Sequence, residues 1–385
     1  MEKIQKNNQR ISWIDIAKCI GIIAIVLGHC SSGNLKCICF SFNSIIFFVL
    51  AGMTFCRKKE KTDVYFSFDN ERTLKIFLYR AFRALLVPYL FWGLVSILIY
   101  SVMGRLTAQT LNMSQSHFEI GKNFIFLLYG NSDTGYFEWN RPLWFIPCLF
   151  MAELLWVLIL KVSEIFHNIK NLIWIIYAAT MFLSAANMFY ISYSGNKFVF
   201  PLELETAVSM MFFFGIGLFC RNEKFINLIH KYVLSDKKLL QYLSFAFGTG
   251  LTIFLSAANG LTDTRSDSYS NVLIYILNAL CACFLIILIA RVIYCNSLME
   301  YIGQRTMAIL VMHKFPIMFL RVFFPFTDQK ISEGNILCEI TVCVFTIGCC
   351  LMAEKIISRI IPEVFGKGRS QHIKNVIFQK DGQNI

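Results

Sequence analysis

Long apolar stretches recur along the whole chain and are separated by short polar segments. A helix needs about 20 apolar residues to cross a bilayer. Ten stretches of suitable length lie near 12–30, 38–56, 84–104, 143–160, 172–191, 203–220, 239–258, 271–294, 306–324 and 335–353. The pattern predicts an all-α fold: one integral membrane domain over 1–385, a bundle of about ten spanning helices with no separate soluble domain.

Composition supports a membrane protein and excludes an ordinary soluble one, because 56% of the residues are hydrophobic and the mean hydropathy is +0.58. No small-residue cleavage site follows the first apolar stretch, so we expect it to be a retained helix rather than a signal peptide. Cysteine is frequent, but the 14 Cys form no C-x-x-C pair and lie mostly in apolar stretches. We therefore expect no metal site and no structural disulfide.

The net charge of +12 is distributed by loop and does not indicate nucleic acid as a partner. Of the 36 Lys and Arg, 26 lie in the two tails and in alternate loops, whereas seven lie in the loops between them. Cytoplasmic loops of membrane proteins carry this excess of basic residues. The distribution predicts that both termini are cytoplasmic.

The first apolar stretch carries three ionisable residues, Asp15, Lys18 and His29. On a helix, the eleven-residue step from Lys18 to His29 is three turns plus about 20°, and Asp15 falls within about 40° of His29. All three side chains therefore share one face, with Lys18 and His29 roughly 16 Å apart along the axis. Ionisable groups at membrane depth usually face a bundle interior or a wet cavity. The alternative is structural: Asp15 pairs with Lys18, and His29 caps the helix.

Five segments, in order along the chain, carry a resemblance to a known family. They are WIDIAKCIGIIAIVLGH (13–29), NSIIFFVLAGMTF (43–55), YRAFRALLVPYLFW (79–92), RPLWFIPCLF (141–150) and YIGQRTMAILVMH (301–313). The set resembles the acyltransferase family 3 integral membrane proteins, especially the fucose 4-O-acetylase-like branch. Many members have arginine where this chain has Lys18, and Ser-Gly where it has Ala51-Gly52.

The resemblance implies a membrane O-acyltransferase, most simply an O-acetyltransferase. Such an enzyme moves an acetyl group from cytoplasmic acetyl-CoA to a hydroxyl of a carbohydrate or cell-surface glycan outside. It also implies that His29 is catalytic and that Arg80 and Arg83, with Lys18, bind the phosphates of the donor. An imidazole can take a hydroxyl proton or carry an acyl group. The alternative for Arg80 and Arg83 is ordinary anchoring on the cytoplasmic side.

Further candidates follow from position and from the family pattern. Asp15 and His313 are additional catalytic candidates, although a mid-membrane histidine can instead hydrogen-bond to a neighbouring helix. Substrate-binding candidates lie before the fourth apolar stretch: Glu138, Asn140, Arg141 and Trp144. An indole packs well on a sugar face, but Trp also occurs there as part of an aromatic belt. Glu153 is a buried acid for which the sequence identifies no partner.

A rival class is a secondary transporter or lipid-linked sugar flippase, which also places charged residues inside an apolar bundle. The two halves, 1–190 and 191–385, show no clear correspondence, which does not favour a transporter built from repeats. A third class is a sensory or scaffolding protein that keeps the fold without the chemistry. For the enzyme we expect the partners to be acyl-CoA, a glycan acceptor and membrane lipid. We expect it in a cell membrane, namely the cytoplasmic membrane of a bacterium.

Overall fold

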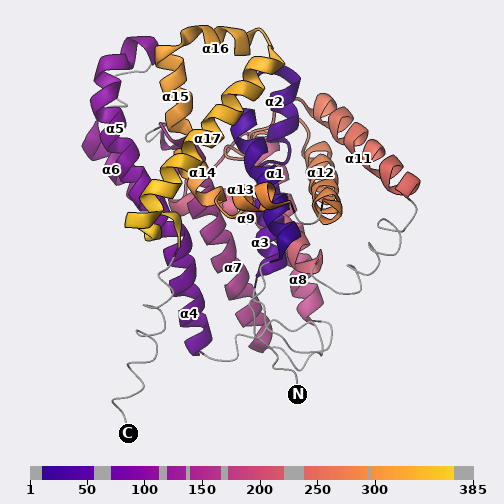
Figure 1. Ribbon diagram of the computed structural model, residues 1–385. Helices are drawn as coiled ribbons and strands as arrows, with labels where there is room; N and C mark the ends of the chain where they lie inside the picture. Colours follow the sequence, from indigo (N-terminus) through magenta and orange to yellow (C-terminus); the bar gives the residue numbers. More distant parts are fainter. Residues whose placement is uncertain are drawn as a thin grey trace, which may run out of the picture.

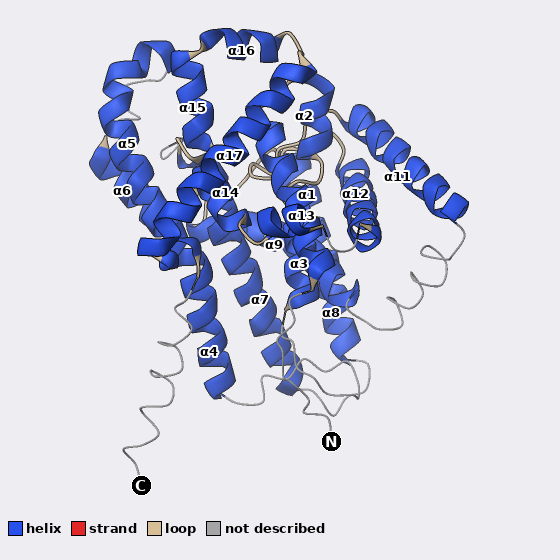
Figure 2. Ribbon diagram, in the orientation of Figure 1, coloured by secondary structure: helices blue, strands red, loops and turns tan. Residues whose placement is uncertain are grey.

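The computed structural model describes residues 11–55, 71–111, 119–135, 139–165, 172–220, 238–293 and 296–367. Every regular element in these ranges is a helix (Figure 2), and Asp263 and Ser268 form one isolated bridge. The elements are α1 (Ser12–His29), α2 (Gly33–Phe40), α3 (Ile45–Thr54), α4 (Glu71–Ala81), η1 (Phe82–Leu86), α5 (Val87–Leu111), α6 (Ile120–Tyr129), η3 (Ser132–Thr134), η4 (Arg141–Trp144), α7 (Phe145–Ile165), α8 (Leu172–Ser194), η5 (Pro201–Glu203), α9 (Leu204–Cys220), α11 (Lys238–Asn259), α12 (Val272–Val292), α13 (Ser297–Gly303), α14 (Thr306–Met312), α15 (Lys314–Phe323), α16 (Pro325–Ser332), α17 (Ile336–Ile360) and η6 (Pro362–Phe365).

Nine helical segments of the described residues are long and apolar enough to cross a membrane, so the predicted all-α membrane fold is confirmed. They are Ser12–His29, Gly33–Thr54, Leu74–Ser101, Arg141–Ser163, Trp174–Ser194, Pro201–Cys220, Val272–Val292, Thr306–Phe323 and Ile336–Ile360. The tenth predicted span, 239–258, is helical as α11, but it is not among them. Polar positions such as Gln241, Ser244 and Thr252 lower its hydropathy and leave it outside the nine segments.

Helix α1 lies in the middle of the bundle (Figure 1) and contacts α2, α3, α12, α13, α14 and α17. Most of its apolar side chains are buried, including Ile16, Ile22 and Val26. Gly303 of α13 packs directly against the backbone of Asp15 in α1, and a Cβ atom at this glycine would collide with the Asp15 carbonyl group. Small residues allow this kind of backbone approach between helices in membranes.

Two helix irregularities occur next to prolines. The chain adopts a π-helical turn over Phe82–Leu86, just before Pro88. It also breaks at His313, between α14 and α15, just before Pro316. Proline lacks an N–H donor, and its ring collides with the carbonyl group four residues earlier, so both disturbances have a local cause. The second break places His313 at a junction of two helices rather than in the middle of one.

Candidate active site

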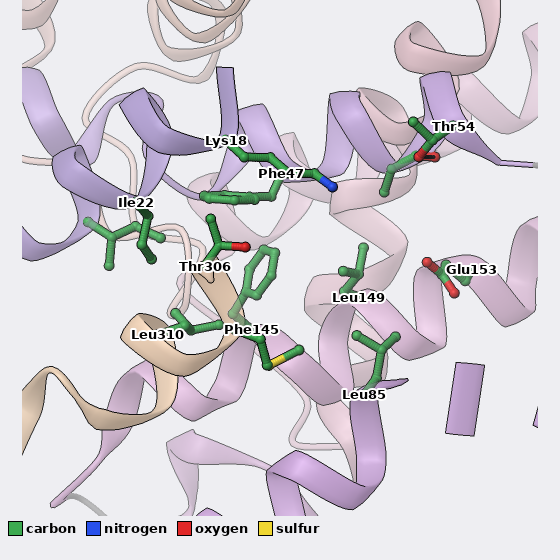
Figure 3. Close-up of a pocket in the computed structure, with 13 residues that line it drawn as sticks. Lys18, Ile22, Phe47, Thr54, Leu85, Phe145, Leu149, Glu153, Thr306 and Leu310 are labelled. Carbon is green, nitrogen blue, oxygen red and sulfur yellow. Dashed lines mark hydrogen bonds between the residues drawn. The ribbon is translucent and has the colours of Figure 1, made fainter. Parts of the chain in front are cut away.

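A pocket with a volume of about 240 Å³ lies between α1, α3, η1, α7 and α14. Figure 3 shows that its apolar side chains surround a small number of polar groups. Lys18 enters the pocket from α1, Glu153 from α7, Thr54 from α3 and Thr306 from α14. The remaining lining residues are Ile22, Ile25, Phe47, Ala51, Leu85, Phe145, Leu149, Met307 and Leu310. Such a pocket, apolar with a few convergent polar groups, is the usual form of a small-molecule site.

The pocket follows one stripe on each of two facing helices. On α1 the stripe is Lys18, Ile22 and Ile25, and the next residue at helical spacing is His29. On α14 the stripe is Thr306 and Leu310, and the next position is His313. Helices α1 and α14 are in contact. Lys18 and His29 therefore both face α14, as the helical projection predicts.

The two histidines meet where these stripes end. The ring centroids of His29 and His313 are 5.2 Å apart, and the ring planes are inclined by 30°. The edge of the Phe40 ring also packs on His29, at a centroid distance of 5.5 Å. Sequence reasoning proposed His29 and His313 separately and did not pair them, because 284 positions separate them along the chain.

The hydrogen bonds of His313 define its tautomer. Nδ1 lies 2.8 Å from the carbonyl oxygen of Leu310 and 3.1 Å from that of Ile309. Carbonyl oxygens only accept, so Nδ1 carries a proton and donates it. The buried Nε2 then presents a lone pair and has no hydrogen-bond partner in the described part of the protein. Neither ring nitrogen of His29 is engaged by a hydrogen bond from the described residues.

Three cationic side chains act on the histidine pair. Besides His313, the charged side chains that act on the His29 ring are Lys314, Lys36 and Arg321. The ammonium of Lys36 lies 5.7 Å from the centroid of the Phe40 ring, and Arg321 donates to Asp328 at 3.1 Å. Lys314, the first residue of α15, makes no hydrogen bond or ion pair with the described residues. Lys314 is not among the residues predicted for the site, although a lysine inside an apolar stretch is a signal that could have identified it.

The predicted donor-binding arginines lie at the other end of the pocket. Arg80 is exposed near the end of α4, and the Arg83 guanidinium lies 5.7 Å from the centroid of the Tyr79 ring. Leu85, two residues after Arg83, is part of the pocket wall. The pocket thus lies between the two arginines on one side and the two histidines on the other.

The four predicted substrate-binding residues differ in their surroundings. Asn140 is fully buried, and its Nδ2 donates to the carbonyl oxygen of Val311 at 2.8 Å, so it joins η4 to α14. Arg141 is exposed, and the Trp144 ring packs on Phe145, a pocket residue, with 6.1 Å between ring centroids. Glu138 lies outside the described residues.

Asp15, the other catalytic candidate in α1, is 4% exposed and is not part of the pocket wall. Its backbone contacts α13, a helix whose Glu300 accepts a hydrogen bond from Ser12. The structure therefore does not bring Asp15 together with His29. Within the described ranges, no group of three or more His, Cys, Asp or Glu side chains could hold a metal ion.

A buried ion network joins three connecting segments, and nothing in the sequence pattern indicates it. Lys197 lies 2.8 Å from Asp133 and 3.3 Å from Asp267, and Arg265 pairs with Asp133 and with Asp263 at 3.2 Å. Burial lowers the pKa of Lys197, but the charges of Asp267 and Asp133 outweigh it and leave the pKa raised. Burial raises the pKa of Asp267 despite the nearby Lys197 ammonium. Burial of this carboxylate thus outweighs its ion pair.

Comparison with known families identifies the chain. The family model for the acyltransferase domain, acyltransferase 3, matches residues 11–355 of the 385. Searches of curated proteins and of solved structures give no significant match. The matched range contains both histidines, both arginines and every residue of the pocket wall. The protein belongs to the acyltransferase 3 family and is a multi-pass membrane acyltransferase.

Proposed function

We propose that this acyltransferase moves an acetyl group from cytoplasmic acetyl-CoA to a hydroxyl of a carbohydrate or cell-surface glycan on the opposite side of the membrane. The observation that carries the proposal is the stacking of His29 on His313, at the end of two stripes that line one pocket. Arg80 and Arg83, beyond the other end of that pocket, are suited to the phosphates of CoA. The donor and the acceptor then approach the histidines from opposite ends.

His29 acts first as the general base and then as the general acid. The acceptor hydroxyl oxygen forms a bond to the thioester carbonyl carbon, and an unprotonated ring nitrogen of His29 removes the hydroxyl proton. The C–S bond then breaks, and the CoA thiolate takes the proton from the imidazolium. His313, whose Nδ1 is held by backbone carbonyls, positions the His29 ring by stacking.

Lys314 supports the same step through charge. During acyl transfer, negative charge develops on the thioester carbonyl oxygen, and a fixed donor near that oxygen lowers the barrier. Lys314 directly follows His313, and its charge acts on the His29 ring. Its ammonium, unpaired among the described residues, is available for this oxygen.

The experiment that tests the function measures transfer of labelled acetyl from acetyl-CoA in membranes that contain the protein and its native glycans. His29→Ala should reduce transfer about 100-fold or more, the loss expected when a general base is removed. Asn196→Ala, at an exposed loop position, is the matched control and should retain wild-type transfer. Full transfer by folded, inserted His29→Ala protein would refute the proposal. Labelled acetyl on surface glycans separates an enzyme from a transporter or scaffold.

We also propose that both termini are cytoplasmic, which requires an even number of crossings. Within the described ranges, nine segments meet the length and apolarity of a span, and α11 is one further helix there of comparable length. The proposal therefore needs α11 to cross the membrane beside α12, which it contacts. Fusions of a reporter active only in the cytoplasm, placed at each terminus, test it. An inactive reporter at one end only would show an odd number of crossings.

A further inference from the structure

Glu153 and Lys18 face the same space from opposite walls of the pocket (Figure 3). Glu153 lies in α7, within the membrane-spanning segment Arg141–Ser163. No hydrogen bond or ion pair with the described residues engages its carboxylate. Lys18 and Glu153 therefore share the pocket without forming an ion pair.

A carboxylate in this position has an energetic cost that the protein itself does not offset. Taking an acid out of water into an apolar site is unfavourable unless hydrogen-bond donors compensate. Nine of the 13 lining residues are apolar, and the polar ones besides Glu153 are Lys18, Thr54 and Thr306. None of the described residues, these three included, donates a hydrogen bond to its carboxylate. The compensating donor is thus expected to arrive with a bound ligand.

The pocket restricts the chemistry of that ligand. A phosphate would meet the negative charge of Glu153, and a sugar would leave most of its hydroxyls against apolar walls. An uncharged chain with separated amide groups fits both the apolar and the polar lining residues. Its N–H groups can donate to Glu153 and Thr54. Its C=O groups can accept from Lys18 and Thr306. Thr54 Oγ1 already donates to the Leu50 carbonyl oxygen at 2.9 Å, so it can accept from a ligand.

The two ends of the pocket indicate which molecule carries this chain. Leu85, close to Arg83, marks one end, and Ile25 and Leu310, one turn from His29 and His313, mark the other. A ligand that fills the pocket therefore connects the arginines to the histidines. The arm of CoA between its phosphates and its sulfur has this composition: a slender chain with two amides.

We infer that Glu153 accepts a hydrogen bond from an amide N–H of the pantetheine arm of acyl-CoA, while Lys18 donates to an amide carbonyl of the same arm. The inference rests on the proposed function. Lys18 then binds the arm of the donor rather than its phosphates. Phosphate binding is left to Arg80 and Arg83, outside the pocket wall.

Binding measurements on the full chain in nanodiscs test the inference without needing the acceptor. Three probes compete with labelled CoA: unlabelled CoA, pantetheine, which is the arm alone, and adenosine 3′,5′-bisphosphate, which is the nucleotide part alone. Glu153→Leu should weaken CoA and pantetheine about tenfold, which corresponds to about 1.4 kcal/mol, and leave the nucleotide probe unchanged. Glu153→Gln keeps an acceptor oxygen and should lose less.

A double variant, Arg80→Gln with Arg83→Gln, is the matched comparison and should affect the opposite set of probes. This variant should weaken CoA and the nucleotide probe while pantetheine binds as to the wild type. If Glu153→Leu leaves pantetheine binding unchanged, or weakens the nucleotide probe equally, the inference is wrong while the donor assignment stands. If wild-type protein binds neither CoA nor any part of it, the proposed function fails as well.

Discussion

The side-chain amide of Asn140 donates to the carbonyl oxygen of Val311 at 2.8 Å, two residues before His313. Both groups are buried, and Asn140 also donates to Ser96 Oγ at 3.3 Å. Asn140→Ala should therefore lower the free energy of unfolding by about 1–3 kcal/mol, because it leaves a buried carbonyl without its donor. Thermal unfolding in detergent measures this effect. An unchanged melting temperature would mean that the hydrogen bond contributes nothing to stability.

The stacking of His313 on His29 predicts a different result for two substitutions at position 313. His313→Phe keeps a flat ring beside His29 and should retain most of the acetyl transfer, whereas His313→Ala removes the ring and should reduce kcat about tenfold, since a misplaced reacting group loses rate steeply. If His313→Phe reduces kcat as much as His313→Ala does, Nε2 of His313 takes part in proton transfer.

Lys314→Met should reduce kcat about 10- to 100-fold and leave the KM for acetyl-CoA near the wild-type value, because an oxyanion contact is made mainly in the transition state. Lys314→Arg keeps the charge and should recover much of the loss. Lys330→Met, on α16, is the matched control. A raised KM with unchanged kcat would instead place Lys314 in ground-state binding.

Proton transfer by His29 predicts that no acetyl-enzyme accumulates. Protein mixed with labelled acetyl-CoA in the absence of acceptor should carry no label after rapid quenching and denaturation. Label that wild-type protein retains and His29→Ala protein lacks would show that the imidazole carries the acetyl group itself.

The buried ion network predicts that the effects of replacing Lys197 and Asp267 on stability are coupled. Lys197→Met leaves Asp133 and Asp267 without their shared cation and should destabilise the protein by about 3–5 kcal/mol. Lys197→Met combined with Asp267→Asn should recover part of this loss. Equal melting temperatures for the single and double variants would show that the two residues are not coupled.

The raised pKa of Asp267 predicts a pH dependence of stability. The folded protein binds the Asp267 proton more tightly than the unfolded chain, whose carboxyl titrates near pH 4. This carboxyl therefore stabilises the fold below about pH 4, and that contribution is lost as the pH rises through the raised value. Asp267→Asn cannot ionise, so its melting temperature should fall less than that of the wild type as the pH rises over this range.

Much of the fold was predictable because a lipid-facing helix must be apolar over a fixed length. The segments around 12–30, 143–160 and 271–294 were located within a few residues of their observed ends. The shared face of Lys18 and His29 was predictable too, because it depends only on helical geometry. The predicted span 239–258 is a helix, α11, but its polar positions leave it outside the nine candidate segments.

The arrangement of the site depended on contacts that the sequence does not encode locally. The pairing of His29 with His313, the opposition of Lys18 and Glu153, and the network around Lys197 each join helices or loops far apart along the chain. The burial of Asn140 was not predicted for the same reason. A polar residue in a loop gives no sign that its side-chain amide donates to a helix carbonyl.

The imidazole of His313 is fixed by carbonyls of its own helix, three and four residues earlier, at a break that a nearby proline accounts for. Its orientation is consequently a property of one short stretch of chain and does not depend on distant partners. Changes in distant loops should therefore leave the direction of this ring unaltered, so under the proposed function one reactive geometry is compatible with different acceptor-binding loops.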